Sequence, residues 1–245
     1  MTLEPDSVAE QAAAEPSRPL TARERYERIY LVLRDRICLL EYPPGSRLSE
    51  EELAQEFQTS RTPVRRVLAR LESEGLVQSL HGVGTIVTDV DIEELQQVYH
   101  LRLELAELMG KLSPIPRTAT DLERIRTLIR RCDTEMRNPD QRAFLRLNMD
   151  FFHELSAMTG NQPLRDISER LYFQVARVVL KMMPQLGLVE EFTAFRREMM
   201  ETLAAAEIND WESIGHIRRA HISMSFRRMM LHRGEEVADK ARRTL

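Results

Sequence analysis

Residues 60–87 have the sequence SRTPVRRVLARLESEGLVQSLHGVGTIV, in which a helical pattern is followed by two short runs rich in β-branched residues. Apolar residues recur at helical spacing at Val64, Val67, Leu68 and Leu71. Gly75 is a residue type that commonly ends a helix, and the glycine-containing residues 81–84 separate the two extended runs. The sequence therefore predicts one helix followed by a β-hairpin.

Two more helices are predicted before this stretch. An amphipathic pattern covers residues 21–40 and stops at residues 43–45, which are Pro-Pro-Gly. Residues 49–52, Ser-Glu-Glu-Glu, have the pattern of a capping box that starts a second, short helix, and Ser60 caps the third. The order helix, helix, helix, hairpin over residues 22–89 is that of a winged helix-turn-helix domain.

The third helix carries a cluster of basic residues, since residues 60–70 contain four arginines and no acid. The N-terminal part of a recognition helix contacts base edges and phosphates, and arginine can bind guanine O6 and N7 with two hydrogen bonds. The alternative is an ordinary solvated face. The predicted DNA-contacting residues are Ser60, Arg61, Thr62, Arg65 and Arg66, with His81 and Gly82 at the hairpin tip.

Residues 33–87 resemble the DNA-binding domain of the GntR family of bacterial transcriptional regulators. The matching elements are Leu33-Arg34, Ile37, PGSRL at 44–48, Glu52-Leu53-Ala54, SRTPVR at 60–65, LESEGLV at 71–77, Gly84 and Val87. The resemblance implies that Arg61, Thr62 and Arg65 contact operator DNA and that the tip of the wing enters the minor groove.

Two positions depart from the family pattern, which usually has an acid at the position of Arg66 and a basic residue at that of Val83. We therefore expect stronger phosphate binding at the helix and weaker binding at the wing. His81 and Gly82 could partly replace the wing contact. Alternatively, Gly82 and Gly84 only shape the turn.

From residue 91 onward the pattern changes to long helices without strands. Start and stop signals predict helices over about 91–113, 120–138, 140–159, 161–183, 189–208 and 210–234, the last closed by Gly234. The expected fold class is mainly α, with an N-terminal winged helix-turn-helix and small β-hairpin followed by an all-α bundle of six to seven helices. The expected domains are residues 22–89 and 90–234, between a disordered tail over 1–21 and a frayed tail over 235–245.

Residues 91–234 resemble the all-helical FCD effector domain of the FadR-like subgroup. The matching elements are VYHLRLE at 98–104, FHEL at 152–155, Gly160-Asn161, Asp210 and His221. The resemblance implies a bound small molecule, often a carboxylate, and in many members a divalent metal held by one Asp and three His. Met149 and Met199 occupy two of those four positions, which leaves His153, His221 and the nearby Asp150 as metal candidates. We therefore expect no required cofactor.

Three polar side chains interrupt apolar helical faces in this part of the chain. Arg102 interrupts an apolar stripe, His153 follows two phenylalanines, and His221 lies within a second stripe. A buried guanidinium without a partner is unfavourable, so Arg102 either pairs with a glutamate such as Glu104 or faces a cavity that takes an anion. Each histidine alone could be a satisfied core residue. The predicted effector-binding residues are Arg102, Asp150, His153, His221, Met149 and Met199, for a ligand with an acidic end and an apolar body.

Composition excludes several other classes of protein. The chain has 35 Lys and Arg against 39 Asp and Glu, and it has two cysteines, so a disulfide scaffold and a Cys-rich zinc module are excluded. No run of about 18 apolar residues is present, and the first residues lack an apolar signal segment, so we expect a cytoplasmic protein without membrane contact. No phosphate-binding loop or nucleophile elbow occurs, and Ala157 breaks the H-E-x-x-H pattern that begins at His153, so an enzyme is not expected.

The predicted function is a sequence-specific transcriptional regulator, expected to be a repressor, that binds double-stranded operator DNA and is controlled by a small organic acid. A second apolar stripe on the first bundle helix is expected to form a homodimer that binds a near-palindromic site. Its residues are Val98, Leu101, Leu105, Leu108 and Leu112. One alternative is a ligand-independent architectural or scaffold dimer that binds DNA, and a more remote one is an enzyme.

Overall fold

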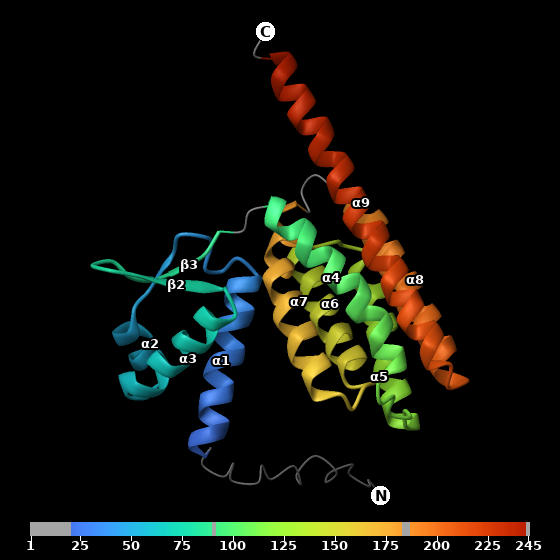
Figure 1. Ribbon diagram of the computed structural model, residues 1–245, viewed down its shortest axis with the longest axis horizontal. Coiled ribbons are helices and arrows are strands. Elements are labelled where there is room, and N and C mark those ends of the chain that lie inside the picture. Colours follow the sequence, from blue (N-terminus) through green and yellow to red (C-terminus); the bar gives the residue numbers. More distant parts are fainter. Residues whose placement is uncertain (1–20, 90–91, 183–186, 244–245) are drawn as a thin grey trace, which may run out of the picture.

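A computed structural model describes residues 21–89, 92–182 and 187–243 of the chain. The chain forms two parts that lie side by side, an N-terminal domain that contains the strands and a larger helical domain (Figure 1). The predicted disordered tail over residues 1–21 lies outside the described residues except for Thr21. No helix in the described part of the chain combines the length and apolarity that crossing a membrane needs.

The N-terminal domain contains three helices and a small antiparallel sheet, as predicted. Its elements are α1 (Ala22–Cys38), β1 (Arg47–Leu48), α2 (Glu50–Glu56), α3 (Arg61–Ser73), β2 (Val77–Leu80) and β3 (Gly84–Val87). The strand order is β1-β3-β2, with Arg47 and Gln78 both paired with Ile86 on the central strand. Strand β1 was not predicted, because two residues are too few to show an alternating pattern.

Local side-chain bonds explain where these helices begin. Thr21 and Glu24 form a complete capping box at the start of α1. At α2 only one bond of the predicted box forms, from the Glu52 amide to the Ser49 hydroxyl at 3.4 Å. Ser60 is the N-cap of α3, but its hydroxyl accepts no bond from the helix. The first amide groups of α3 therefore remain available to an external anion.

The described part of the helical domain contains the six predicted helices. They are α4 (Ile92–Lys111), α5 (Ala119–Glu135), α6 (Gln141–Ser156), α7 (Gln162–Met182), α8 (Leu188–Glu207) and α9 (Trp211–Arg243). The last helix continues through Gly234 to Arg243, so the predicted helix end at Gly234 is wrong. The predicted frayed tail over residues 235–245 stays a prediction. A glycine inside a helix costs only about 1 kcal/mol relative to alanine, which does not by itself end a helix.

Three apolar clusters hold the molecule together. The first joins the two domains, because buried residues of α1 and α3 pack with Leu145 and Phe152 of α6 and Phe173 of α7. The second is the centre of the helical domain, around Phe151 and Phe192. The third fills the space between α4, α7 and α9. Helix α7 therefore contacts the N-terminal domain and also lines the interior of the helical domain.

Helices α4 and α9 approach closely at two glycines. A Cβ atom on Gly110 would overlap the backbone carbonyl of Trp211, and one on Gly215 would lie 2.7 Å from the carbonyl oxygen of Glu107. Only glycine permits this separation of the backbones. The close packing brings the polar residues of α9 next to Arg102 on α4.

Candidate nucleic-acid interface and ligand cavity

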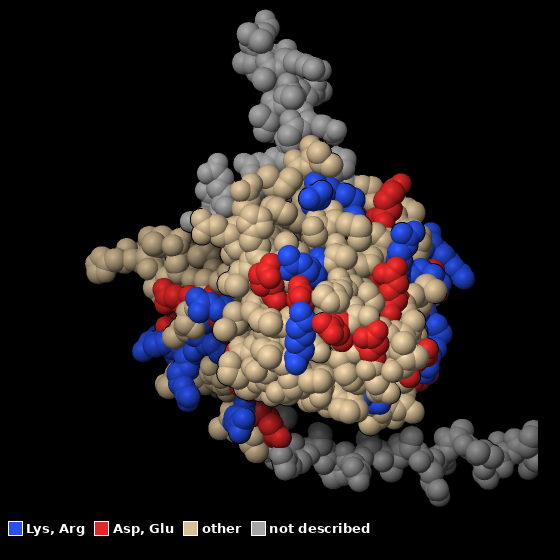
Figure 2. All heavy atoms as spheres, turned by 45° about the vertical axis from the view of Figure 1, so that its right-hand side comes forward, with Lys and Arg blue, Asp and Glu red and all other residues tan. Residues whose placement is uncertain are grey.

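The start of α3 presents a basic surface to solvent. Arg61 and Arg65 expose 58% and 70% of their side chains. Ser60, Thr62 and Arg66 are exposed beside them, and Arg66 lies over the ring of Tyr26, 5.5 Å from its centroid. Figure 2 shows Lys and Arg side chains gathered on the N-terminal domain below the hairpin.

Acids of α2 hold the two exposed arginines in place. Glu50 accepts two hydrogen bonds from Arg65, at 2.9 Å from Nε and 2.8 Å from Nη2. Glu51 lies 2.7 Å from Nη2 of Arg61. The bonds from Arg65 lower the pKa of Glu50, so this carboxylate stays charged. Exposed pairs of this kind contribute little free energy, so a phosphate or a base edge can replace the carboxylates.

The hairpin between β2 and β3 forms the wing. Gly82 and Gly84 have φ angles of +76° and +106°, which favour glycine and support the alternative that these residues shape the turn. His81 and Gly82 are exposed at the tip, as a DNA contact requires.

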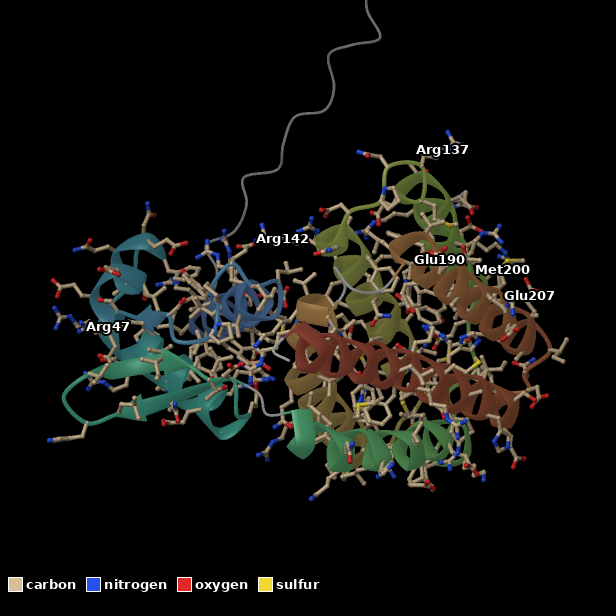
Figure 3. All side chains as sticks on the ribbon, turned by 90° about the horizontal axis from the view of Figure 1, so that it is seen from above. Arg47, Arg137, Arg142, Glu190, Met200 and Glu207 are labelled. Carbon is tan, nitrogen blue, oxygen red and sulfur yellow. The ribbon has the colours of Figure 1, made fainter. Side chains whose placement is uncertain are left out.

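Arg47 is a basic residue near the wing that the sequence analysis missed. A Cβ atom on Gly84 would lie 3.5 Å from Nε of Arg47, so this side chain runs along the wing from β1 and projects outward (Figure 3). It supplies a positive charge close to where the family pattern has one at the position of Val83. Because the pairing of β1 with β3 creates this proximity, no local pattern could have shown it.

A cavity of about 70 Å³ lies inside the helical domain, between α4, α6, α7, α8 and α9. Aromatic residues and buried charges form its walls. Its arginines are Arg102, Arg218 and Arg228, its acids are Glu191 and Glu198, and His221 lies beside them.

Two of the three arginines in this cavity are paired with acids. Nη1 of Arg218 lies 2.6 Å from Oε1 of Glu198, and both side chains are buried. Arg228 donates two hydrogen bonds to Glu191, one of them at 2.9 Å. Each of these guanidinium groups is therefore neutralised within the cavity wall.

Arg102 is the third arginine and has no carboxylate within ion-pair distance among the described residues. Its side chain is buried, with the residue 8% exposed, and its guanidinium lies 5.4 Å and 5.5 Å from the ring centroids of Tyr99 and Tyr172. The hydroxyl of Tyr99 donates to Sδ of Met229 instead, at 3.9 Å. Burial lowers the pKa of Arg102, with a further contribution from the positive charge of Arg218. Three guanidinium groups face two carboxylates, so the wall carries one uncompensated positive charge.

The pairing of Arg102 with Glu104, left open by the sequence, does not form. Glu104 is exposed and lies 2.7 Å from Nη1 of Arg219 instead. Residues two apart on a helix point in different directions, so Glu104 cannot turn toward the cavity that Arg102 faces.

The structure brings together two of the six predicted effector-binding residues. Arg102 and His221 line the cavity, and Nε2 of His221 lies 3.0 Å from Oε2 of Glu201. The other four do not line it, and their part in effector binding stays a prediction. Met149 lies in the core between the domains and Met199 in the core of the helical domain.

The remaining two residues lie on other surfaces. Asp150 is exposed and pairs with Arg131 at 2.5 Å. His153 is partly exposed, with Nδ1 3.8 Å from Oε1 of Glu169, and it lies near Arg34 of the N-terminal domain. Burial, and then the charge of Arg34, lowers the pKa of His153.

The metal site that the family resemblance implies does not fit these residues. Within the described parts of the chain, no group of three or more His, Cys, Asp or Glu is placed to hold an ion. His153 and His221 have separate carboxylate neighbours, Glu169 and Glu201, and only His221 faces the cavity.

Most of the charged cavity wall was not predicted from the sequence. Arg218, His221, Ser225 and Arg228 recur at spacings of three and four on α9 and therefore share one helical face. This polar stripe is the signal that could have identified them. Their partners Glu191 and Glu198 are seven residues apart on α8, on the face that meets α9.

A winged helix with exposed arginines, joined to a helical domain with a charged cavity, is typical of a DNA-binding transcriptional regulator. The family model described as bacterial regulatory proteins, gntR family, matches residues 25–87, and the FCD domain model matches residues 97–224. The chain therefore belongs to the GntR family and carries an FCD domain.

Known relatives share parts of this sequence. An uncharacterised HTH-type regulator of Streptomyces ambofaciens is 46% identical over 88 residues, which are 36% of each chain. The uncharacterised regulator YdhC of Bacillus subtilis is 24% identical over 147 residues, 60% of this chain and 66% of that one. The matches thus span less than two thirds of these relatives. Among solved structures, E. coli McbR/YncC has a TM-score of 0.73 at 19% identity over 84% of this chain and 97% of that one, which shows a shared fold.

Proposed function

We propose that this protein is a transcriptional repressor whose operator binding is controlled by a small organic anion held in the cavity of the helical domain. The observation that carries the proposal is the uncompensated charge of Arg102. A buried ion without a counterion is strongly unfavourable, and a bound carboxylate would supply the missing charge through a forked, charge-assisted pair.

The cavity restricts the chemistry of the effector. Its volume of about 70 Å³ favours a short acid. One uncompensated guanidinium favours a single carboxylate over two, because Glu191 and Glu198 would repel a second. Phe144, Phe195 and Tyr99 supply an apolar wall for the body of the ligand.

Repression is supported by the relatives. The gluconate operon transcriptional repressor of Bacillus licheniformis is 32% identical over 114 residues, 45% of this chain and 46% of that one. We extend this mode of action to the present chain. The absence of a catalytic motif in the sequence and the family membership both support a regulator rather than an enzyme.

A second copy of this chain is the proposed partner on DNA. Leu101 and Leu108 of α4, and Leu112 directly after this helix, are exposed large apolar side chains, at 47%, 37% and 38%. A helix with one apolar stripe in the core and another at the surface fits a two-fold interface, and two recognition helices would match a near-palindromic operator.

Replacing Arg102 by methionine is expected to stabilise the ligand-free protein and to remove its response to carboxylates. The substitution deletes an uncompensated buried charge and keeps an apolar side chain of similar length, so the free energy of unfolding should rise by about 1–4 kcal/mol. Urea denaturation followed by circular dichroism measures this change. Arg219→Met, which removes an exposed pair, is the matched control, with an expected change within about 1 kcal/mol. A loss of stability in Arg102→Met would show that Arg102 is a structural residue.

A further inference from the structure

Two side chains of α7 bind the backbone at the end of the recognition helix. Nε2 of Gln174 donates to the carbonyl oxygen of Glu74 at 2.9 Å, and Glu74 is the C-cap of α3. Arg177 donates to the carbonyl oxygen of Thr88 at 2.6 Å and to its hydroxyl at 2.8 Å. That hydroxyl in turn donates to the carbonyl oxygen of Gly75 at 2.7 Å. These bonds connect the helical domain to the last turn of α3 and to the end of β3.

Such bonds are well suited to fixing a helix in place. The last carbonyl groups of a helix lack partners within the helix, and they carry partial negative charge. Arg177 is 3% exposed, and no carboxylate lies within ion-pair distance of it among the described residues. Carbonyl and hydroxyl oxygens of the N-terminal domain therefore compensate its charge. Burial lowers the pKa of Arg177, and the charge of Asp89 offsets only part of this effect.

The same helix forms part of the cavity wall. Val175 and Ala176, which lie between Gln174 and Arg177 in the sequence, line the cavity together with Tyr172 and Val179. Figure 1 shows α7 at the edge of the helical domain, between α1 and the other helices. A displacement of α7 that fits it to a ligand must therefore also move the side chains that hold α3.

Small movements at this end of α3 have larger effects at the other. The 13 residues of α3 span roughly 20 Å. A tilt of about 5° at Gly75 would move Arg61 by roughly 2 Å. Recognition geometry tolerates only about 0.5 Å, so the angle of α3 decides whether both recognition helices of a dimer meet their half-sites.

We propose that Gln174 and Arg177 are positioning residues for DNA recognition, and that α7 transmits the state of the cavity to the recognition helix through them. The link to the cavity rests on the ligand control proposed above. The bonds themselves fix the orientation of α3 and the wing relative to the helical domain, whether or not a ligand is bound.

The test compares operators with altered half-site spacing. The full-length protein first selects its operator from a random duplex library, and one base pair is then inserted between the half-sites. Wild-type protein should lose roughly 10- to 100-fold in affinity on insertion. Arg177→Met and Gln174→Ala should lose less than about threefold, because their recognition helices are no longer held at one angle. Arg177→Lys should restore part of the discrimination, since it keeps one donor for Thr88.

Hydrogen exchange separates a positioning role from a general loss of stability. In both variants the amides of residues 74–77 and 88 should exchange faster, while those of α6 and α8 keep wild-type rates. Arg170→Met, an exposed position on the same helix, is the matched control and should behave as wild type in both assays. If Arg177→Met does not fold, the test rests on Gln174→Ala, because this variant removes only a neutral amide.

Full spacing discrimination in the variants, with residues 74–77 still protected, would overturn the proposed positioning role. A wild-type protein that selects no operator would instead contradict the function proposed above. Loss of discrimination with faster exchange confined to residues 74–77 and 88 would support the proposal.

Discussion

Replacing Arg61 and Arg65 together by alanine is expected to abolish specific binding to the selected operator. Each exposed arginine that contacts a base contributes about 1–3 kcal/mol, so the double substitution should weaken binding by at least roughly 30-fold. The loss should be increased by Glu50 and Glu51. These two acids now pair with the two arginines. In the double variant the acids would have no partner, and their negative charge would repel the DNA phosphates.

Gel-shift titration of the operator and of a scrambled duplex measures this effect. Arg66→Ala is the informative control. Loss of a phosphate contact should weaken binding to both duplexes alike and reduce the slope of log affinity against log salt concentration by about one. Arg126→Ala with Arg130→Ala, on the exposed face of α5, controls for the loss of two positive charges. Operator affinity within threefold of wild type in the Arg61 and Arg65 double variant would contradict the assignment of α3 as the recognition helix.

Replacing Glu198 by leucine is expected to cause the largest loss of stability among changes to the cavity. Glu198 is the partner of Arg218, and both groups are buried. Without this carboxylate, Arg102 and Arg218 would be two uncompensated cations in one cavity wall. Removing one partner of a buried pair typically costs 3–5 kcal/mol, so we expect about that decrease in the free energy of unfolding.

A second substitution tests the electrostatic cause of this loss. Glu198→Leu combined with Arg218→Leu removes both charges and should recover most of the stability, since buried pairs can be replaced by apolar residues at little cost. Glu104→Leu, which breaks an exposed pair with Arg219, should cost less than about 1 kcal/mol. Urea denaturation of the four proteins gives the comparison. Equal losses of stability in Glu198→Leu and Glu104→Leu would contradict this cause and would show that water in the cavity screens its charges.

Local signals in the sequence were enough to predict the N-terminal domain. Proline, glycine and capping residues mark each boundary there. Arg61, Arg65 and Arg66 lie on the exposed face of α3, as the pattern required, whereas Arg70 is half-buried. Only β1 escaped, because a two-residue strand exists through its pairing with β3. At Gly234 the sequence predicted a helix end that the structure does not have, because this glycine lies within α9.

The cavity was only partly predictable. Arg102 was identified because it interrupts an apolar stripe, which is a property of one helix. That His153 and Asp150 lie away from this cavity could not be predicted, because each step of one residue turns a helix by about 100° and the local pattern does not show which face meets which neighbour. Glu198 and Arg218 form a pair only through the packing of α8 against α9. The docking of α7 on the N-terminal domain likewise depends on the whole chain.

The most direct measurement is a titration of the operator complex with short carboxylates, followed by fluorescence anisotropy of labelled DNA. The panel contains monocarboxylates and dicarboxylates of two to six carbons, and the proteins are wild type and Arg102→Met. We predict that at least one monocarboxylate shifts the operator affinity of wild type by roughly fivefold or more, which is a coupling of about 1 kcal/mol. The same acid should leave Arg102→Met unchanged, although this variant binds the operator as wild type does. An equal shift in both proteins, or no shift with any acid of the panel, would contradict control by an anion at Arg102.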